Sequence, residues 1–410
     1  MGAAILIAAP LKVGIAGLGT VGGGVYKILT QDHDHLVRQC GRRIEVVAVS
    51  VRNPDKVRDF TIRCRMVTDP LELARDPEID VVVELVGGSE GVAKDLVVTA
   101  LENGKAVVTA NKALLSAHGP SIAQLAEQKN VPLKFESAVA AGLPVIKLLR
   151  EALTGNHVSG IFGVINGSTN AILSMMAEQN MAYDDAIKIA AERGWLEADP
   201  SLDVDGWDAA HKLSILIALS YGRWCPVGAM AVSGISKVTD AHLRLAAQID
   251  GALRLIGRAE PVETGLLASV SMHVVPRKSQ FFNVSGTLNG VMIDGSRTGP
   301  LFITGSGAGQ DTTASGVIAD IVDIARGNVH GPVFGRSAET LKHLETLVAT
   351  PVVSDYILMG HFAAEGHSDA IDAATGIHAR IYQNLTQGAL QRILAEQNDP
   401  DMVAYPVLTV

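Results

Sequence analysis

The chain has few cysteines, fewer basic than acidic residues and no long apolar run, and each of these features excludes a class of protein. The 43 acidic residues outnumber the 34 basic ones, and the resulting net charge of -9 argues against nucleic acid and anionic membranes as main partners. No apolar run reaches the roughly 18 residues of a membrane span. Neither a disulfide framework nor a zinc site is indicated, because no CxxC or CxxH spacing occurs among the three cysteines, Cys40, Cys64 and Cys225.

The first twelve residues are apolar, but they lack the basic start of a secretory signal. Pro10 and Lys12 interrupt the run just before a glycine-rich turn. We therefore expect a short extension that leads into a buried strand, in a soluble protein of the reducing cytoplasm. With 48% hydrophobic and 19% charged residues, the 410-residue chain is long enough for two or three domains with large cores.

A glycine pattern follows the first predicted strand. Gly17, Gly19 and Gly22 match G-x-G-x-x-G between a strand that starts at Lys12 and a helix that ends near Leu29. The first glycine allows a tight turn, the second lets a pyrophosphate approach the backbone, and the third lets the helix pack on the strand. The pattern predicts a dinucleotide site, and the cofactor contacts are expected to include Thr20 and Val21.

The second predicted strand, 44–51, lacks an acid at its end. An NAD site usually carries one there to bind the ribose 2′-hydroxyl. Here Arg52 and Lys56 follow the strand instead, and their positive charge favours NADP over NAD. The alternative interpretation is that both are solvated loop residues.

Strands and helices continue to alternate up to residue 139. Strands are predicted at 80–86, 106–109 and 133–139, and helices at 70–75 and 92–103. This alternation predicts a doubly wound parallel sheet of Rossmann type, with ligands at the carboxyl ends of its strands. Gly87 and Lys112 follow two such ends. For Lys112 we favour a functional role over that of an ordinary loop lysine.

Beyond a break at Gly142 and Pro144, the chain predicts further domains. A polar cluster at 166–170 follows a strand-like segment and can cap a helix at 171–179. Segments at 265–275, 283–293 and 299–304 are β-like. The glycine turn at 305–309, which contains Gly307, either binds an anion or simply connects to a helix at 312–326.

The densest charge in the chain lies between Gly194 and Lys212, directly before an apolar segment at 213–219. A surface helix would place its polar residues opposite its apolar stripe, whereas here the charged part precedes the apolar part, which indicates a lined pocket. Asp208 and Lys212 are spaced i,i+4 and would share one helix face. The alternative is an acidic surface loop with an ordinary helix pair.

These segments together resemble homoserine dehydrogenase. Seven stretches carry the resemblance, in the family's order over about residues 12–326: GLGTVGGGV (17–25), ELVGG (84–88), VVTANKALL (107–115), ESAVAAGLPV (136–145), GVINGSTNAIL (163–173), the acid-rich span 194–212, and GSGAGQDTTASGVIADIVDIA (305–325). The acid-rich span is specific to the family, whereas the glycine turns are not.

The resemblance implies an α/β fold with several parts. They are a Rossmann-type nucleotide domain at 1–145, an α+β substrate-binding and dimerisation domain at 146–311, a helix at 312–330 that returns to the nucleotide domain, and a small α+β module at 331–410. We expect a homodimer or a higher homo-oligomer. Because no kinase domain precedes the nucleotide motif, the chain resembles the monofunctional form.

The resemblance also implies roles for single residues. Lys212 matches the proton donor to the carbonyl oxygen, and Lys112 matches a second active-site lysine near the nicotinamide. Glu197 and Asp208 match carboxylates that bind the amino acid substrate, and Asp203 matches another acid of that pocket. A sodium site, held mostly by backbone carbonyl groups, is implied at Glu136, Val139, Ala141 and Leu143.

The implied reaction is the NADP-dependent reduction of aspartate 4-semialdehyde to homoserine, a step towards threonine, methionine and isoleucine. The substrate's ammonium needs acids, and its developing alkoxide needs a cation that stabilises and protonates it. Two alternatives remain. One is a non-catalytic dinucleotide sensor, and the other is a related NADP oxidoreductase for another small amino aldehyde.

The C-terminal module departs from the family pattern. Members of about this length often end in an ACT regulatory module, in which an Asp-x-Pro-Gly-type turn follows the first strand. Here the predicted strand 355–362 is followed by Ala-Ala-Glu-Gly-His-Ser at 363–368. The module is therefore expected to be a divergent ACT-like domain at most, and the resemblance does not extend to feedback control by threonine.

Overall fold

The computed structural model describes residues 8–196, 200–328, 331–344, 347–348, 353–362, 368–397 and 399–410. Contacts divide the chain into two compact units. The first contains residues 1–155, 214–226 and 306–343, and the second contains residues 156–213, 227–305 and 344–410. The finer domain boundaries expected from the sequence stay predictions. Over the described ranges, no helix combines the length and the apolarity needed to cross a membrane.

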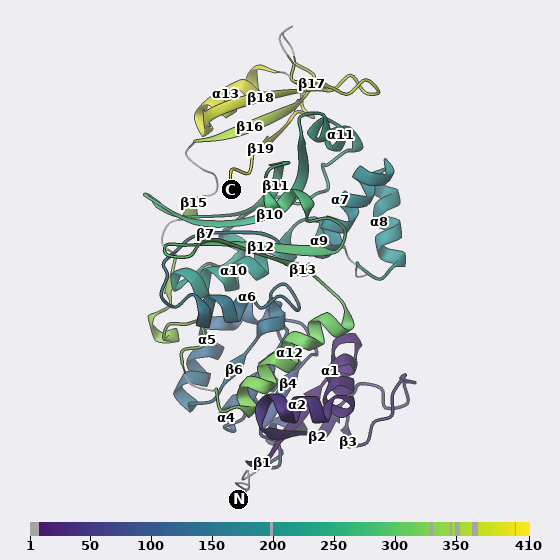
Figure 1. Cartoon of the computed structure of the whole chain (residues 1–410), viewed down its shortest axis with the longest axis vertical. Coiled ribbons are helices and arrows are strands. Elements are labelled where there is room, and N and C mark those ends of the chain that lie inside the picture. The colour runs from purple at the N-terminus through teal and green to yellow at the C-terminus, as the bar shows by residue number, and fades with distance from the viewer. Residues whose placement is uncertain are drawn as a thin grey trace, which may run out of the picture. The chain divides into compact units, whose positions relative to one another are not determined.

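A parallel sheet of six strands forms the centre of the first unit (Figure 1). Its order, β3-β2-β1-β4-β5-β6, is that of two mononucleotide-binding halves joined at β1 and β4. The predicted doubly wound fold is thus confirmed. The strands are β1 (Ala8–Ala16), β2 (Arg42–Ser50), β3 (Arg65–Val67), β4 (Val81–Glu84), β5 (Ala106–Thr109) and β6 (Leu133–Lys134).

Helices cover both faces of this sheet. Right-handed crossovers that run in opposite directions along a parallel sheet place their helices on opposite faces. One face carries α1 (Thr20–Gln31), α2 (His33–Cys40) and, from far along the sequence, α12 (Gln310–Ala325), which lies beside α1 in Figure 1. The other carries α3 (Leu71–Arg75), α4 (Val92–Glu102) and α5 (Lys112–Lys129).

In the core of the first unit, every second residue of a strand points to the same side of the sheet, as expected for strands. Val13, Ile15, Val81, Val83 and Val108 are fully buried and pack with α1, α2 and α12. The two helices α1 and α12 approach each other closely. A Cβ atom on Gly24 of α1 would lie only 2.9 Å from the side chain of Gln310.

The chain after β6 differs from the sequence prediction. The strand predicted to reach residue 139 ends at Lys134, and a 3-10 turn occupies Glu136–Ala138. Helix α6 (Val145–Lys147) then continues as a π-helical turn at Leu148–Ala152. Two short strands, β8 (Arg223–Trp224) and β14 (Lys342–His343), pair in parallel in the same unit.

A mixed sheet forms the centre of the second unit, in the order β13-β12-β7-β10-β11-β15, with β9 paired to β11. The strands are β7 (Val158–Val164), β9 (Ala231–Val232), β10 (Gly251–Val262), β11 (Gly265–Pro276), β12 (Leu288–Gly295), β13 (Gly299–Ser306) and β15 (Leu347–Val348). Strand β10 was not predicted from the sequence. Its residues are buried along most of its length and include Arg254 and Arg258, so the polar and apolar alternation of a strand is absent.

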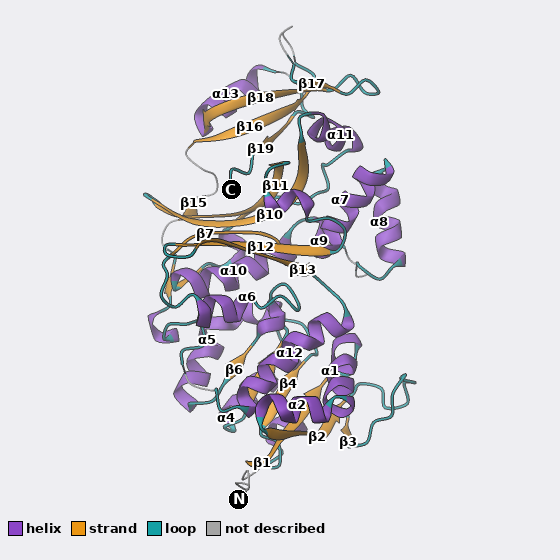
Figure 2. Ribbon diagram, viewed as in Figure 1, coloured by secondary structure: helices purple, strands orange, loops and turns teal. Residues whose placement is uncertain are grey.

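Helices of the second unit flank this sheet (Figure 2). They are α7 (Gly167–Gln179), α8 (Tyr183–Glu192), α9 (Ser201–Val204) and α11 (Asp240–Gln248). Helix α10 (Trp207–Tyr221) begins in this unit, and its later residues belong to the first unit.

A small antiparallel sheet forms the C-terminal module, in the order β17-β18-β16-β19. Its elements are β16 (Val353–Gly360), β17 (Ala370–Ile371), β18 (His378–Thr386), α13 (Gln387–Glu396) and β19 (Val403–Pro406). This confirms the predicted α+β module. Most of the turn that departs from the family, residues 363–367, lies outside the described residues.

Candidate active site

Three glycines form the turn between β1 and α1. Gly17 has a φ of +91°, and a Cβ atom there would lie 2.6 Å from the carbonyl oxygen of Leu85. A Cβ atom on Gly22 would lie 1.9 Å from the carbonyl oxygen of Gly17, whereas one on Gly19 would meet no atom within 4 Å. Packing therefore requires the first and third glycines, and the second leaves the turn open to a ligand.

Helix α1 presents its first turn without a side-chain cap. Its N-cap residue is Gly19, and no acidic side chain lies in the first turn, which begins with Thr20 and Val21. The unpaired N–H groups and the positive end of the helix dipole favour an anion at this position. The turn therefore fits the pyrophosphate of a dinucleotide.

A cavity of about 540 Å³ opens beside this turn. Its lining includes Gly17, Gly19, Ser50, Arg52, Lys56 and Arg58. Arg58 was not predicted from the sequence, although a third basic residue in the loop after β2 was a visible signal. Its guanidinium donates to the carbonyl oxygens of Lys56 at 2.7 Å and Asn53 at 3.2 Å, which fixes the loop that carries the cations.

The carboxyl ends of β4 and β5 are joined through Glu84, which is fully buried. Its Oε1 accepts from the backbone N–H groups of Val86 at 2.9 Å and Gly87 at 3.0 Å. Its Oε2 accepts from the hydroxyl of Thr109 at 2.6 Å. No role was predicted for Glu84 from the sequence, in which it is a single acid within an apolar strand.

Lys112 is the first residue of α5, and the structure fixes the backbone that carries it. The N-cap residue Asn111 accepts from the N–H of Leu114 at 3.0 Å and donates from Nδ2 to the carbonyl oxygen of Gly88 at 2.7 Å. The glycine loop after β4 and the start of α5 are thus tied together. Gly307 lies in the turn before α12, whose N-cap, Gly309, likewise supplies no side-chain cap.

In the second unit, Asn166 joins two acids at the end of β7. Its Nδ2 donates to Oδ1 of Asp203 at 2.6 Å and to Oδ2 of Asp208 at 2.8 Å. Its Oδ1 accepts from the N–H of Thr169 at 2.8 Å, as the N-cap of α7. The predicted cap is thus confirmed, although α7 begins at Gly167, four residues earlier than expected. The second role of Asn166, between the acids, was missed.

Lys212 completes this cluster. Its ammonium donates to Oδ2 of Asp208 at 2.8 Å and to the carbonyl oxygen of Ile165 at 2.7 Å. The two side chains are 13% and 9% exposed, one helical turn apart on α10. A buried, hydrogen-bonded pair of this kind differs from a solvated surface pair. Glu197, expected in the same pocket, lies outside the described residues.

Glu136, the expected side-chain ligand of sodium, has another partner. Its Oε1 and Oε2 accept from the backbone N–H groups of Ile146 at 2.8 Å and Lys147 at 2.9 Å, at the start of α6. Burial and the neighbouring charge of Asp320 raise the pKa of Glu136 to about 8. The carboxyl group therefore serves the protein's own backbone.

The backbone of the same turn offers oxygen atoms of a different kind. Ala140 and Ala141 have φ values of +55° and +54°, a conformation that residues with a Cβ rarely adopt. Over the described part of the chain, no group of three His, Cys, Asp or Glu side chains could hold a metal ion. A cation in this turn would therefore rely on carbonyl oxygens such as those of Val139, Ala141 and Leu143, which suit a hard ion.

Two family descriptions match this chain, and the matched residues include parts of both units. The family description "Homoserine dehydrogenase, NAD binding domain" matches residues 17–136, and "Homoserine dehydrogenase" matches residues 144–322. A homoserine dehydrogenase of Pseudomonas aeruginosa is 42% identical over 323 residues, which are 79% of this chain and 74% of that protein.

Solved structures agree with these matches. A homoserine dehydrogenase from Thiobacillus denitrificans has a TM-score of 0.88 and 34% identity, over 97% of this chain and 98% of that one. A hyperthermophilic archaeal homoserine dehydrogenase in complex with NADPH has a TM-score of 0.64 and 29% identity, over 77% of this chain and 97% of that one.

Proposed function

The chain belongs to the homoserine dehydrogenase family of oxidoreductases, and we propose that it reduces aspartate 4-semialdehyde to homoserine with NADPH as the preferred hydride donor. The observation that carries this proposal is the hydrogen-bonded cluster of the partly buried Asp203 and Lys212 with the buried Asp208 and Asn166. On this proposal the enzyme serves the biosynthesis of threonine, methionine and isoleucine.

The nucleotide is proposed to bind along the turn at Gly17, Gly19 and Gly22 and the first turn of α1. When bound, the reduced nicotinamide supplies the hydride. Arg52, Lys56 and Arg58 line the cavity beside the turn, and their charges favour the 2′-phosphate of NADP over the free hydroxyl of NAD. The homologue whose structure contains NADPH supports this choice of cofactor. Lys112 is proposed to lie near the nicotinamide.

The substrate is proposed to bind through its ammonium group to Asp208 and Asp203, with Glu197 as a further acid. As the carbonyl carbon accepts a hydride, its oxygen becomes an alkoxide, and the ammonium of Lys212 donates the proton that completes the alcohol. Asp208, one helical turn before Lys212, orients the ammonium of Lys212, and Asn166 orients Asp208.

Sodium is proposed to bind the turn at Glu136, Val139, Ala141 and Leu143 through backbone carbonyl oxygens. The two consecutive left-handed alanines support this, because such a backbone costs free energy and commonly persists at functional sites. Replacing sodium by a bulky organic cation at constant ionic strength should lower the midpoint of thermal unfolding. An unchanged midpoint would contradict the site.

A spectrophotometric assay tests the function. Oxidation of NADPH and of NADH is followed with aspartate semialdehyde and with a panel of other small amino aldehydes, with and without threonine. Faster turnover with NADPH and aspartate semialdehyde than with any other pair is expected. Nucleotide binding without turnover would support the sensor alternative, and preference for another aldehyde would support the related oxidoreductase.

The assembly and location of the protein are further proposals. We propose a cytoplasmic homodimer whose second unit provides both the substrate site and the subunit contact, because its mixed sheet offers an extended surface for pairing. Light scattering after size-exclusion chromatography gives the mass directly. A monomer at micromolar concentration would contradict this assembly.

A further inference from the structure

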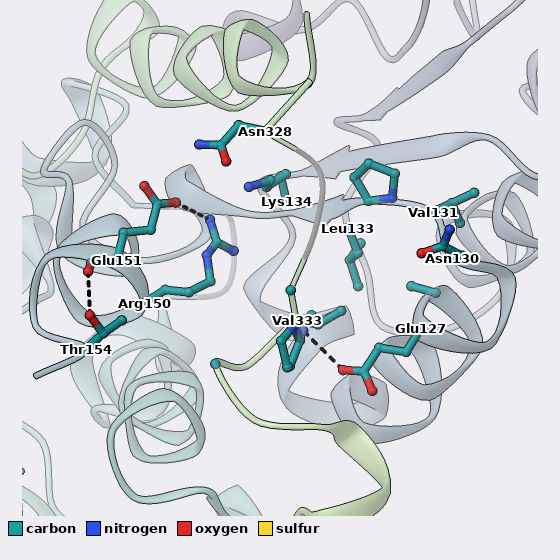
Figure 3. Close-up of a pocket in the computed structure, with 15 residues that line it drawn as sticks. Glu127, Asn130, Val131, Leu133, Lys134, Arg150, Glu151, Thr154, Asn328 and Val333 are labelled. Atoms are coloured by element: carbon teal, nitrogen blue, oxygen red, sulfur yellow. Dashed lines mark hydrogen bonds and ion pairs between the residues drawn. The ribbon is translucent and has the colours of Figure 1, made fainter. Parts of the chain in front are cut away.

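The first unit contains a second cavity, of about 500 Å³, beside strand β6 (Figure 3). Its lining includes Leu133 and Lys134, the two residues of that strand, and Asn130 and Val131 before them. Nucleotides bind doubly wound sheets at the carboxyl ends of the strands. The lining of this cavity has no residue in common with that of the nucleotide cavity, so the two are separate, and neither the family match nor the proposed reaction gives the second one a role.

A buried lysine opens into this cavity. Lys134 is only 8% exposed, and its ammonium makes no hydrogen bond to any residue that the structure describes. The nearest carboxylate oxygen, Oδ2 of Asp323, is 4.0 Å away and lies 2.6 Å from the ammonium of Lys147. Burial, followed by the positive charge of Arg150, lowers the pKa of Lys134. Among the described residues, the three donors of this ammonium thus have no acceptor within hydrogen-bond distance.

A second buried cation borders the same space. The side chain of Arg150 is 10% exposed, and its guanidinium contacts Oε1 of Glu151 at 3.4 Å. Within the described part of the chain this long contact is the one ion pair of the guanidinium, and it leaves most of the five N–H donors for another acceptor. Figure 3 places Lys134, Arg150 and the amide of Asn328 around the open centre of the cavity.

The other acid in the wall does not neutralise these cations. Glu127 accepts through Oε1 from the N–H of Val333 at 3.1 Å, and through Oε2 from Ser337 at 3.2 Å and the N–H of Ala338 at 2.9 Å. Its carboxylate holds the loop that closes one side of the cavity. Among the residues that line the cavity, Glu151 is therefore the acid left to interact with Lys134 and Arg150, and Asp320 and Asp323 attract the charge of Lys134 from outside the lining.

We propose that this cavity binds a small anionic metabolite, whose carboxylate or phosphate group accepts hydrogen bonds from Lys134 and Arg150. Two like charges brought together in a buried site repel each other, and an anion between them relieves the repulsion and satisfies their donors. The planar fork of arginine suits both anionic groups, and lysine adds a compact charge. The volume is within the range of metabolite pockets and larger than an inorganic anion needs.

Calorimetric titration tests this site directly. Inorganic phosphate and malonate, one probe for each anionic group, are titrated separately into the full chain saturated with NADP, so that the cations of the nucleotide cavity are occupied. We compare the wild type with Lys134→Met, Lys134→Arg and Lys129→Met. Lys129 is an exposed lysine at the end of α5 and serves as the matched control.

At least one probe should bind saturably to the wild type and to Lys129→Met. Its affinity for Lys134→Met should be about tenfold or more lower, which corresponds to about 1.4 kcal/mol of binding free energy. Lys134→Arg should retain binding, and the tighter probe identifies the anionic group. Absence of saturable binding of both probes to the wild type, or equal binding by Lys134→Met, would overturn the proposal. The readout is binding alone, so its failure is distinct from a failure of the proposed reaction.

Amine labelling of the wild type covers the case in which Lys134→Met does not fold. A lysine whose pKa is lowered has a larger neutral fraction than an exposed lysine at the same pH, and the neutral amine is the form that reacts with acylating reagents. Mass spectrometry should show that the bound probe slows the labelling of Lys134 and leaves that of Lys129 unchanged. Equal labelling of Lys134 with and without the probe would refute an anion at this position.

Discussion

The ammonium of Lys212 lies 2.8 Å from Oδ2 of Asp208, one helical turn earlier on α10, and both side chains are largely buried. The same carboxylate oxygen accepts from Nδ2 of Asn166 at 2.8 Å. Each group therefore compensates the charge of the other in a position that is largely shielded from water. A change to one of them is expected to alter the position of the other.

Lys212→Ala should lower kcat by a factor on the order of 10² or more, because the developing alkoxide loses its proton donor. NADPH affinity, measured by fluorescence titration, should stay nearly unchanged. Lys188→Ala, which removes an exposed lysine of α8, is the matched control and should keep wild-type turnover. Wild-type turnover in Lys212→Ala would refute the proposed role.

Asn166→Asp separates the positioning role of this residue from its capping role. An aspartate still accepts from the N–H of Thr169, so α7 keeps its cap. It also places a third carboxylate against Asp203 and Asp208, where the wild type has a donor. Activity should therefore fall at neutral pH and recover partly as the pH is lowered, when a proton restores a donor.

The comparison variant for this pH profile is Asn166→Ala. It loses the cap, at a cost of about 1 kcal/mol of stability, together with both bonds to the acids. Its activity should be low without recovery at lower pH. If Asn166→Asp followed the wild-type pH profile of kcat/KM, the amide of Asn166 would have no part in holding Asp203 and Asp208 in place.

Each of the variants Arg52→Ala and Arg58→Ala should weaken the binding of NADPH more than the binding of NADH. A hydrogen bond between charged groups contributes about 1.5–3 kcal/mol, so a loss of roughly 10- to 100-fold in NADPH affinity is expected for a direct phosphate contact. Arg43→Ala removes an exposed arginine of β2 away from the cavity lining and serves as the control. Equal losses for both nucleotides would place the 2′-phosphate elsewhere.

Glu136 should make stability fall as the pH rises. The unfolded carboxyl group loses its proton near its ordinary pKa of 4.5, whereas the folded one keeps it up to about 8. Between these values the folded state binds more protons, so its extra stability is present below pH 4.5 and is lost as the pH rises through 8. Each pKa unit corresponds to about 1.4 kcal/mol.

The measurement is urea unfolding between pH 5 and 8, at a fixed sodium concentration, for the wild type and Glu136→Gln. The wild type should lose more free energy of unfolding over this range than the variant. The comparison uses the change with pH, since the glutamine amide cannot accept from both N–H groups and lowers stability at every pH. Parallel curves would mean that Glu136 titrates at its ordinary pKa.

Local signals explain which parts of the fold were predicted. The glycine pattern and the alternation of strands and helices lie within short stretches, so they indicated the doubly wound sheet and its turn at Gly17. Strand β10 was missed because neighbours on both sides bury it, and such a strand loses the alternation that marks a half-exposed one. Strand β6 stops at Lys134, where Glu136 turns inward to cap α6.

The sequence by itself determined the nucleotide turn, the class of fold, a helix cap within the polar cluster 166–170 and the shared helix face of Asp208 and Lys212. Each of these depends on residues close together in the chain. Only the tertiary structure decided that Asn166 bridges two acids about forty residues away, that Glu136 is occupied by backbone N–H groups, and that Lys134 and Arg150 border one cavity. These relations arise when separate elements pack together, because packing selects which polar groups meet once water is excluded.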